Sequence, residues 1–196
     1  MERENRLPWD CVLLAAGESK RMGRSKQLLD FHGTPLAEAT LRNALKACER
    51  VVLVQGAANL SFISEQYERV RLVTNYEYRT GQLSSLQRGL AASRSEYVFI
   101  MLADLPLVSP EVYHRVAEAI GEAPAAYPVF GECRGHPVLV GPEAKALLLE
   151  APPKDRAMRV IAPLHPVEAA LGDPSVCRDA DTYEELKRLR EQDRDV

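Results

Sequence analysis

The chain has 196 residues, and its 25 Lys and Arg against 28 Asp and Glu give a formal net charge of −3 at pH 7. This length fits one domain. The slightly acidic balance argues against a nucleic-acid binder, because such proteins usually carry an excess of basic residues. Hydrophobic residues make up 46% of the chain, which excludes wholesale disorder. No apolar run approaches the roughly 20 residues that span a bilayer, so we expect neither a membrane segment nor a signal peptide.

Four cysteines are spread along the chain, at Cys11, Cys48, Cys133 and Cys177. None has the close neighbour in sequence that zinc sites and redox motifs use. We therefore expect all four to stand alone in a reducing, cytoplasmic setting.

Apolar runs that indicate buried strands recur through the first half of the chain. Residues 11–16, 51–54 and 97–102 are continuous apolar runs, typical of strands buried on both faces of a parallel sheet. Residues 70–73 form a weaker copy, and residues 83–93 have a helical pattern. Strands that alternate with helices predict an α/β fold with an open, mainly parallel sheet, in which ligands bind beyond the carboxyl ends of the strands.

Two further helices are expected to begin where a small polar residue precedes a proline. Thr34 and Ser109 each stand in that position, and each is expected to cap a helix whose first residue is the proline. The last third of the chain is rich in proline and predicts shorter elements. These are a strand at 137–140, a helix at 142–149 and a final helix from residue 181 or 182 with a capping box.

A cationic, glycine-containing loop follows the first strand, within residues 14–29 (LAAGESKRMGRSKQLL). Gly17 stands where the strand ends, and four cations lie between positions 20 and 26, Arg21 and Lys26 among them. Backbone N–H groups and fixed positive charges are what a polyphosphate requires. The loop lacks the endings of a P-loop and of a dinucleotide-binding fingerprint. A solvated basic loop is the alternative, but the position directly beyond a buried strand favours a phosphate site.

A lone carboxylate, Asp104, follows the apolar run at 97–102. It is therefore expected at the same edge of the sheet as the cationic loop. Carboxylates in such a place usually hold a hard cation such as Mg²⁺, which bridges phosphate oxygens. The alternative is an aspartate that only stabilises the turn before Ser109.

Three weaker signals lie elsewhere. Gly81 and two serines precede a helix whose N-terminus suits a nucleobase edge or an anion, although capping alone would explain the serines. His136 is held between a glycine and a proline, which is compatible with a ligand contact or with a structural role. Asp179 and Asp181 precede the final helix, either as further metal ligands or as favourable charges at its N-terminus.

These segments, in this order and spacing, resemble the molybdenum-cofactor nucleotidyltransferases, and most of all the molybdopterin cytidylyltransferases. The likeness covers about residues 10–189. LAAGESKRMG with Lys26 is shared by many nucleotidyltransferases of this fold, with GQLSSL and LADLP in support, whereas RGHPVLV and DADT are more typical of the molybdenum-cofactor branch. The resemblance implies a single Rossmann-like, three-layer domain over residues 1–196, similar to the nucleotide-diphospho-sugar transferases, with flexible tails at 1–9 and 190–196.

The resemblance also implies roles for particular residues. It implies a catalytic set of Arg21, Lys26 and Asp104, and the metal ligands Asp104, Asp179 and Asp181. It implies a nucleotide site made of Leu14, Ala15, Ala16, Gly17, Arg21, Lys26 and Ser85. It implies acceptor contacts at Gly81, Gln82 and His136.

The reaction implied is transfer of CMP from CTP to the phosphate of molybdopterin or molybdenum cofactor, with Mg²⁺ as cofactor and pyrophosphate as the other product. A molybdenum hydroxylase is the implied client, and no nucleic-acid or membrane partner is expected. Guanylyl enzymes tend to carry a second glycine where Ala16 stands, and an alanine methyl group would narrow the pocket in favour of a pyrimidine. Two alternatives stay open: an enzyme of the same fold that uses GTP or a sugar or isoprenoid phosphate, and a non-catalytic protein that delivers the cofactor to a hydroxylase.

Overall fold

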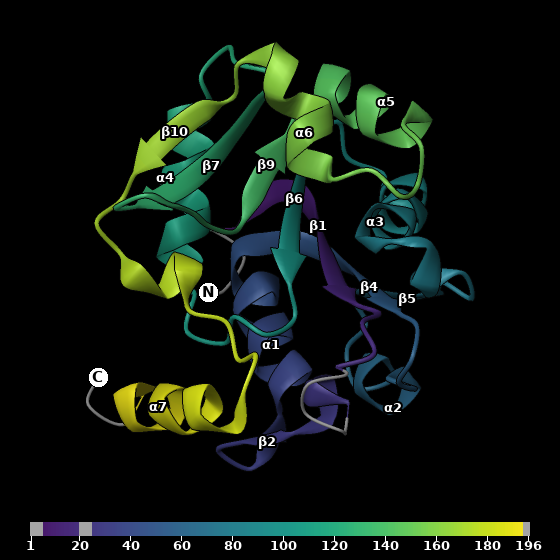
Figure 1. Ribbon diagram of the computed structural model, residues 1–196, viewed down its shortest axis with the longest axis vertical. Coiled ribbons are helices and arrows are strands. Elements are labelled where there is room, and N and C mark those ends of the chain that lie inside the picture. Colours follow the sequence, from purple (N-terminus) through teal and green to yellow (C-terminus); the bar gives the residue numbers. More distant parts are fainter. Residues whose placement is uncertain (1–5, 20–24, 194–196) are drawn as a thin grey trace.

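The computed structural model describes residues 6–19 and 25–193. A central sheet crosses the molecule in the strand order β10-β7-β9-β6-β1-β4-β5, with β8 paired to β7 (Figure 1). The strands are β1 (Leu7–Ala15), β4 (Cys48–Gln55), β5 (Val70–Thr74), β6 (Val98–Leu102), β7 (Ala125–Phe130), β8 (Cys133–Arg134), β9 (Val138–Val140) and β10 (Val167–Ala170).

The sheet is mostly parallel, as the sequence predicts. β1 lies between β4 and β6 and pairs with both in parallel, so that Leu13 stands opposite Leu53 on one side and Met101 on the other. The expected strand near 137–140 is β9, and it runs antiparallel between β6 and β7. β8 also runs antiparallel, to β7, whereas the parallel pairing of β1 with β4 and β6 brings their carboxyl ends to one edge of the sheet.

Helices cover both faces of the sheet and make the three layers that the sequence predicts (Figure 1). Alternate residues of a strand point to opposite faces, so Leu13 packs in one apolar cluster and Val12 in another. The first cluster includes residues of α1 (Leu36–Ala47), α2 (Ser61–Ser64) and α4 (Pro110–Ile120). The second includes residues of α3 (Gln82–Ala92), α5 (Pro142–Glu150) and α6 (Ala157–Ile161).

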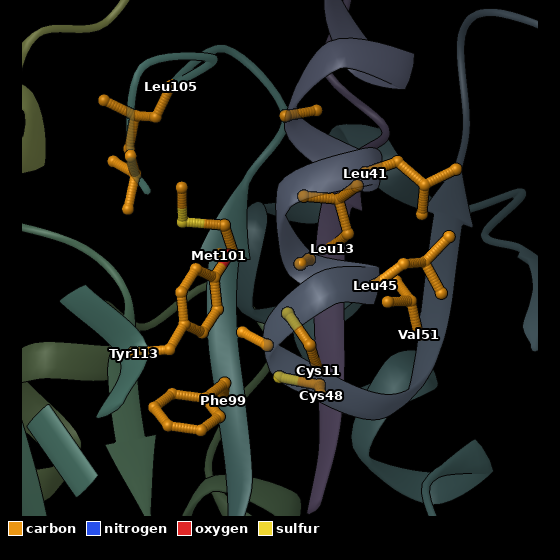
Figure 2. Packing of buried hydrophobic residues seen from close by; sticks show 14 of the residues in the cluster. Cys11, Leu13, Leu41, Leu45, Cys48, Val51, Phe99, Met101, Leu105 and Tyr113 are labelled. Atoms are coloured by element: carbon orange, nitrogen blue, oxygen red, sulfur yellow. The ribbon is translucent and has the colours of Figure 1, made fainter. Parts of the chain in front are cut away.

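The larger cluster is shown in Figure 2. Side chains from α1, α4 and the three central strands meet there with almost no exposed surface. The Tyr113 ring of α4 packs edge-on against Phe99 of β6 at 5.1 Å between ring centres. Burial of each such aromatic side chain stabilises the fold by about 1.5–3 kcal/mol, and the result is a rigid base for the edge where the strands end.

One of the two proline-marked helix starts is wrong. Thr34 does not cap α1, because Thr34 and Pro35 form the short strand β3 (Thr34–Pro35), which pairs with β2 (Asp30–Phe31). The Thr34 hydroxyl donates to the Phe31 carbonyl instead, and the helix begins one residue after the proline. At the other site Pro110 is the first residue of α4 as predicted, although the Ser109 side chain makes no capping hydrogen bond.

Residues 7–9 and 190–193, which we expect to belong to flexible tails, lie in regular elements. β1 begins at Leu7, which pairs with Cys48, and α7 (Tyr183–Asp193) continues to residue 193. Leu186 and Leu189 explain the length of α7, because both are buried against Phe31 and its neighbours. The Thr182 and Glu185 side chains form the predicted capping box, with Glu185 N–H donating to the Thr182 hydroxyl at 3.2 Å.

The expectation of four unpaired cysteines is wrong for two of them. Cys133 and Cys177 form a disulfide that joins β8 to the short helix η5 (Pro174–Cys177), across 44 residues of sequence. Cys11 and Cys48 are free and buried. The pairing arises because β8 folds back onto β7 and η5 lies beside it, which no local spacing reveals. The cysteines therefore give no argument for a reducing compartment.

No helix within the described ranges is both long enough and apolar enough to cross a membrane.

Candidate functional site

The site lies at the carboxyl ends of β1 and β6. The register pairs Leu14 with Leu102, and the N–H of Ala103 donates to the Leu14 carbonyl at 3.1 Å. The segment after β1, with Ala16 and Gly17, therefore leaves the sheet beside Asp104, as the sequence predicts. A pocket of about 240 Å³ opens there. It is lined by Leu14, Ala16, Gly17, Lys26, Gln27, Tyr78, Gln82, Ser85, Leu102, Ala103 and Asp104.

Most of the predicted nucleotide residues face this pocket, but Ala15 does not. Its side chain belongs to the apolar cluster on the opposite face of the sheet, because alternate residues of β1 point to opposite faces. Arg21 lies outside the described residues. The pocket thus brings together Leu14, Ala16, Gly17, Lys26 and Ser85, with Asp104 at its edge.

Lys26 links the cationic loop to two of the predicted carboxylates. Its Nζ donates to Asp104 and, at 2.8 Å, to Oδ1 of Asp181. Burial disfavours the charged ammonium, but the two carboxylates outweigh that effect and raise the pKa of Lys26 above its ordinary value. Lys26 is therefore a fixed positive charge at the end of the pocket.

Asp104, Asp179 and Asp181 form a cluster in which one oxygen of each lies within 4.8 Å of the others. The N–H of Ala180 donates to the Asp104 carbonyl at 3.1 Å and so holds the segment before α7 against the end of β6. Burial and the charges of its two neighbours raise the pKa of Asp179. Among the described residues these three carboxylates gather around one another beside Lys26, and their hard oxygen atoms suit a divalent cation such as Mg²⁺.

Gln27 fixes the chain just after the strand, which sequence analysis missed. Its side chain is only 3% exposed, and its amide donates to the Gly17 carbonyl at 3.0 Å. Its oxygen accepts from Ser19, whose hydroxyl in turn accepts from the Lys26 N–H at 2.9 Å. These hydrogen bonds set the path of the loop, and nothing in the local sequence marks Gln27 as buried.

Asn75 is a second residue that sequence analysis missed. It is fully buried beneath the start of α3, and its amide donates to the hydroxyls of Ser84 and Ser85 at 2.9 Å each. Ser85 lines the pocket, and no acceptor for its hydroxyl proton lies among the described residues. The Ser85 hydroxyl is thus positioned by Asn75 with its proton available to a ligand.

His136 lies in a neighbouring cavity rather than in the nucleotide pocket. That cavity, of about 430 Å³, shares Leu14, Gln82 and Leu102 with the first pocket. Nδ1 of His136 is 3.2 Å from the Ile100 carbonyl. Burial lowers the pKa of His136, against the opposing influence of that carbonyl and of Asp104, so the ring is neutral near pH 7.

Of the other two predicted acceptor residues, Gln82 lines both cavities and Gly81 lines neither. Gly81 instead packs under the loop after α5: a Cβ at this position would lie 2.9 Å from the Pro153 carbonyl oxygen. Gly81 therefore lets that loop approach the start of α3, which is a structural role.

Comparison with known proteins places this geometry in one family. Residues 11–169 match the family described as MobA-like NTP transferase domain. The molybdenum cofactor cytidylyltransferase of Escherichia coli is 28% identical over 72% of this chain and 73% of its own. Nicotine blue oxidoreductase of Paenarthrobacter nicotinovorans is 32% identical over 91% of this chain and 94% of its own.

A solved structure agrees in fold. The crystal structure of Rv0371c from Mycobacterium tuberculosis superposes with a TM-score of 0.76 at 26% identity, covering 94% of this chain and 99% of that one. The family match agrees with the placement of the segment after β1 and of Asp104 at one edge of the sheet. The relatives that this chain matches include nucleotidyltransferases of the molybdenum cofactor. The chain belongs to the MobA-like NTP transferase domain family.

Proposed function

We propose that this protein transfers CMP from CTP to the phosphate of molybdopterin or molybdenum cofactor and releases pyrophosphate. The observation that carries the proposal is the cluster of Asp104, Asp179 and Asp181, in which Asp104 and Asp181 bind the Lys26 ammonium beside a pocket that Lys26 and Asp104 line. The name of the E. coli relative supports the choice of acceptor.

The reaction needs positioned charge rather than a strong base. An oxygen of the acceptor phosphate attacks the α-phosphorus of CTP, and the bond to the β-phosphate oxygen breaks, so pyrophosphate leaves with the electron pair. A phosphate monoester has its second pKa near roughly 6 and is already largely ionised. Catalysis is then a matter of alignment and charge stabilisation.

The residues divide this work between them. Lys26, with its raised pKa, holds the charge of the triphosphate, and Arg21 is proposed to share that role. Asp104, Asp179 and Asp181 hold a divalent cation, taken to be Mg²⁺, which neutralises charge on the phosphates when it is bound. A triphosphate that enters the pocket competes with the two carboxylates for the Lys26 ammonium.

The preference for CTP is proposed from Ala16 and Ser85. Ala16 is 5% exposed and lines the pocket, and its Cβ lies so close to Gly56 that a Cβ on that glycine would be 2.8 Å away. The methyl group is therefore held in place and limits the width of the pocket. Ser85 offers its hydroxyl proton to a base edge such as the carbonyl oxygen of cytosine.

Three other functions remain as competitors: transfer from GTP, transfer to a sugar or isoprenoid phosphate, and delivery of a cofactor without catalysis. The nicotine blue oxidoreductase relative adds a fourth, a redox reaction on nicotine blue. Carboxylates clustered around Lys26 favour nucleotidyl transfer over carriage and over reduction, because neither of those needs a triphosphate grip. We also propose a cytoplasmic location and a molybdenum hydroxylase as client.

The test measures pyrophosphate release from CTP, GTP, ATP and UTP, with and without molybdopterin, in Mg²⁺ or in EDTA. The proposal expects release only with CTP, molybdopterin and Mg²⁺ together. Release with GTP alone among the nucleotides would overturn the base assignment, and release with glucose 1-phosphate in place of molybdopterin would overturn the acceptor. A redox reaction of nicotine blue without pyrophosphate release would replace the whole proposal.

Ala16→Gly tests the base assignment directly. Loss of the methyl group should widen the pocket and shift the ratio of kcat/KM for CTP over GTP by about 3–10-fold toward GTP, since one methylene-sized contact is worth about 1–3 kcal/mol at most. Ala15→Gly is the matched control, because the Ala15 side chain faces the opposite side of the sheet. An unchanged ratio in Ala16→Gly would contradict the role of this methyl group.

A further inference from the structure

The second cavity lies beside the nucleotide pocket and is open to it. It shares Leu14, Gln82 and Leu102 with that pocket, whereas Lys26 and Asp104 line only the nucleotide pocket. Lys154 and Arg156, on the loop between α5 and α6, line only the second cavity. The two cavities therefore carry separate positive charges at different places.

We propose that Lys154 and Arg156 are specificity-determining residues that bind a second negatively charged group on the acceptor, separate from the phosphate that reacts. This inference rests on the proposed nucleotidyl transfer, because it takes the second cavity as the acceptor half of the site. The acceptor's reacting phosphate lies toward Lys26 and Asp104. Its other anionic group lies toward the loop after α5.

The floor of the second cavity is apolar. This restricts the chemical nature of the part of the acceptor that joins its two anionic groups. The floor is made by Leu14, Leu83, Leu86, Ile100, Leu102, Val138, Leu148, Ala157, Met158 and Ile161. A sugar in this place would leave several hydroxyls without partners, at a cost of about 1–3 kcal/mol for each. A flat ring that stacks on these side chains has no such cost. The cavity therefore fits a ring with an anion at each end better than a polyol phosphate.

The rim supplies the charge that an anion needs. The side chains of Lys154, Asp155 and Arg156 make no hydrogen bond or ion pair with any residue in the described ranges, and all three are exposed. Two cations against one carboxylate leave one net positive charge at this rim. Other cations near α6 differ in position: Arg159 is exposed and does not line the cavity.

The loop that carries these cations is fixed at both of its approaches to α3. Gln87 of α3 donates from its side-chain amide to the carbonyls of Leu148 and Ala151, at 2.9 and 2.7 Å, and so holds the end of α5. Further along, Pro153 and Lys154 pack on Gly81 at the start of α3, where no Cβ would fit. Lys154 therefore projects from a constrained backbone rather than from a loose surface loop.

His136 adds a polar group to the lining of the second cavity. A carbonyl oxygen only accepts, so Nδ1 of His136 carries the proton that is donated to Ile100. Nε2 of the neutral ring is then an acceptor, and it suits an N–H of a heteroaromatic ring. A ring with N–H groups and a second anion therefore matches His136, Lys154 and Arg156 among the polar groups that line this cavity.

The test uses three fluorescent or competing probes rather than the full acceptor. Pterin-6-carboxylate is flat and anionic, pterin lacks the carboxylate, and glucose 1-phosphate is an anion without a flat ring. We expect pterin-6-carboxylate to bind the whole protein at least tenfold more tightly than pterin, as measured by fluorescence quenching. Saturating CTP with Mg²⁺ should leave that affinity within twofold, and glucose 1-phosphate should not displace the probe.

Substitutions in the second cavity test where the carboxylate of pterin-6-carboxylate binds. The double variant Lys154→Gln with Arg156→Gln should bring pterin-6-carboxylate down to the affinity of pterin, while pterin itself stays within twofold. Lys26→Ala and the surface control Arg159→Gln should leave both affinities unchanged. Ala157→Phe should fill the cavity and weaken both probes, whereas Ala162→Phe, an exposed position on the next turn, should not. A tenfold difference that survives in the double variant, or full competition by CTP, would overturn the proposal.

Measurements of KM and kcat distinguish a failure of the anion site from a failure of the proposed nucleotidyl transfer. In the double variant the KM for molybdopterin should rise at least fivefold with kcat within twofold, and the thermal shift given by CTP should be unchanged. Normal transfer with an unchanged KM overturns the role of Lys154 and Arg156 and leaves the reaction standing. Absence of any transfer by the wild type, with the probe results as expected, overturns the reaction and leaves the anion site standing.

Discussion

Two buried aspartates mark the two edges of the sheet, and they are treated differently. Asp10, toward the beginning of β1, is 2% exposed and accepts from the Arg50 guanidinium at 2.7 Å and from the Arg94 N–H at 2.6 Å. Asp104, just past β6, is 6% exposed and shares a single ammonium with Asp181. Burial alone would raise the pKa of Asp10, but Arg50 and the backbone donor lower it below its usual value.

The difference between the partners of Asp10 and Asp104 distinguishes a structural carboxylate from a functional one. At the amino edge one carboxylate has one cation and a backbone donor, so its charge is balanced and nothing is left for a ligand. At the carboxyl edge three carboxylates lie together within the described part of the chain, and like charges held this close favour a bound cation. Under-compensated groups in a cleft are typical of functional sites. Substitutions at the two edges should therefore differ in their effects on turnover and on stability.

The largest effect is expected at the carboxyl edge. Asp104→Ala and Lys26→Ala should each lower turnover by about 10²–10³-fold, the usual cost of losing one group that stabilises charge in a transition state. Both proteins should stay folded by circular dichroism. Glu111→Gln, an exposed position on the first turn of α4 that lines neither cavity, is the control. Near-normal turnover in purified Asp104→Ala would remove the basis of the metal assignment.

The next effect concerns the disulfide that fixes the segment leading to Asp179. Replacing Cys133 and Cys177 by serine should lower the free energy of unfolding by about 2–4 kcal/mol, because a loop of 44 residues is then no longer closed in the unfolded chain. Urea titrations of the oxidised wild type, the reduced wild type and the double variant measure this. The reduced protein and the variant should agree, and four free thiols in the unfolded, unreduced wild type would show that the bond does not form.

At the amino edge the effect should fall on stability alone. Asp10→Asn should lower the free energy of unfolding by about 2–3 kcal/mol at pH 7, since it leaves Arg50 without a buried partner. The folded pKa of Asp10 is lowered, so its contribution is present above the unfolded pKa and is lost as the pH falls through the folded value. Wild type and variant should therefore converge in acid. Turnover at a temperature where both are folded should be equal, and a large loss would contradict a structural role.

The smallest effect has the opposite sign. Asp179→Asn removes a like charge from beside Asp104 and Asp181, so in EDTA it should raise the free energy of unfolding by up to about 1 kcal/mol after allowance for solvent screening. In Mg²⁺ the same variant should gain less stability than the wild type and turn over more slowly. Thermal melts in the two buffers measure both. A variant that is less stable in EDTA would show that the cluster is balanced after all.

Much of the fold could be predicted because its signals are local. The apolar runs found β1, β4, β5 and β6, and the motif after β1 found Lys26 and Gly17. β7 and β10 were not predicted, because Pro128 interrupts the first and β10 alternates only weakly along four residues. Gln27 and Asn75 gave no signal of their own, since a polar residue becomes informative only when its burial is known.

The sequence by itself determined the strands β1, β4, β5, β6 and β9, most of the longer helices that cover them, and which residues carry charge at the ends of β1 and β6. Those properties depend on runs of a dozen residues or fewer. Only the tertiary structure decided which charges meet: Lys26 and Asp181 are 155 residues apart, and Cys133 and Cys177 pair only because β8 and η5 lie together. It also placed His136 and the loop after α5 in a second cavity. Sheet order brings distant segments to one edge, and no local pattern records that order.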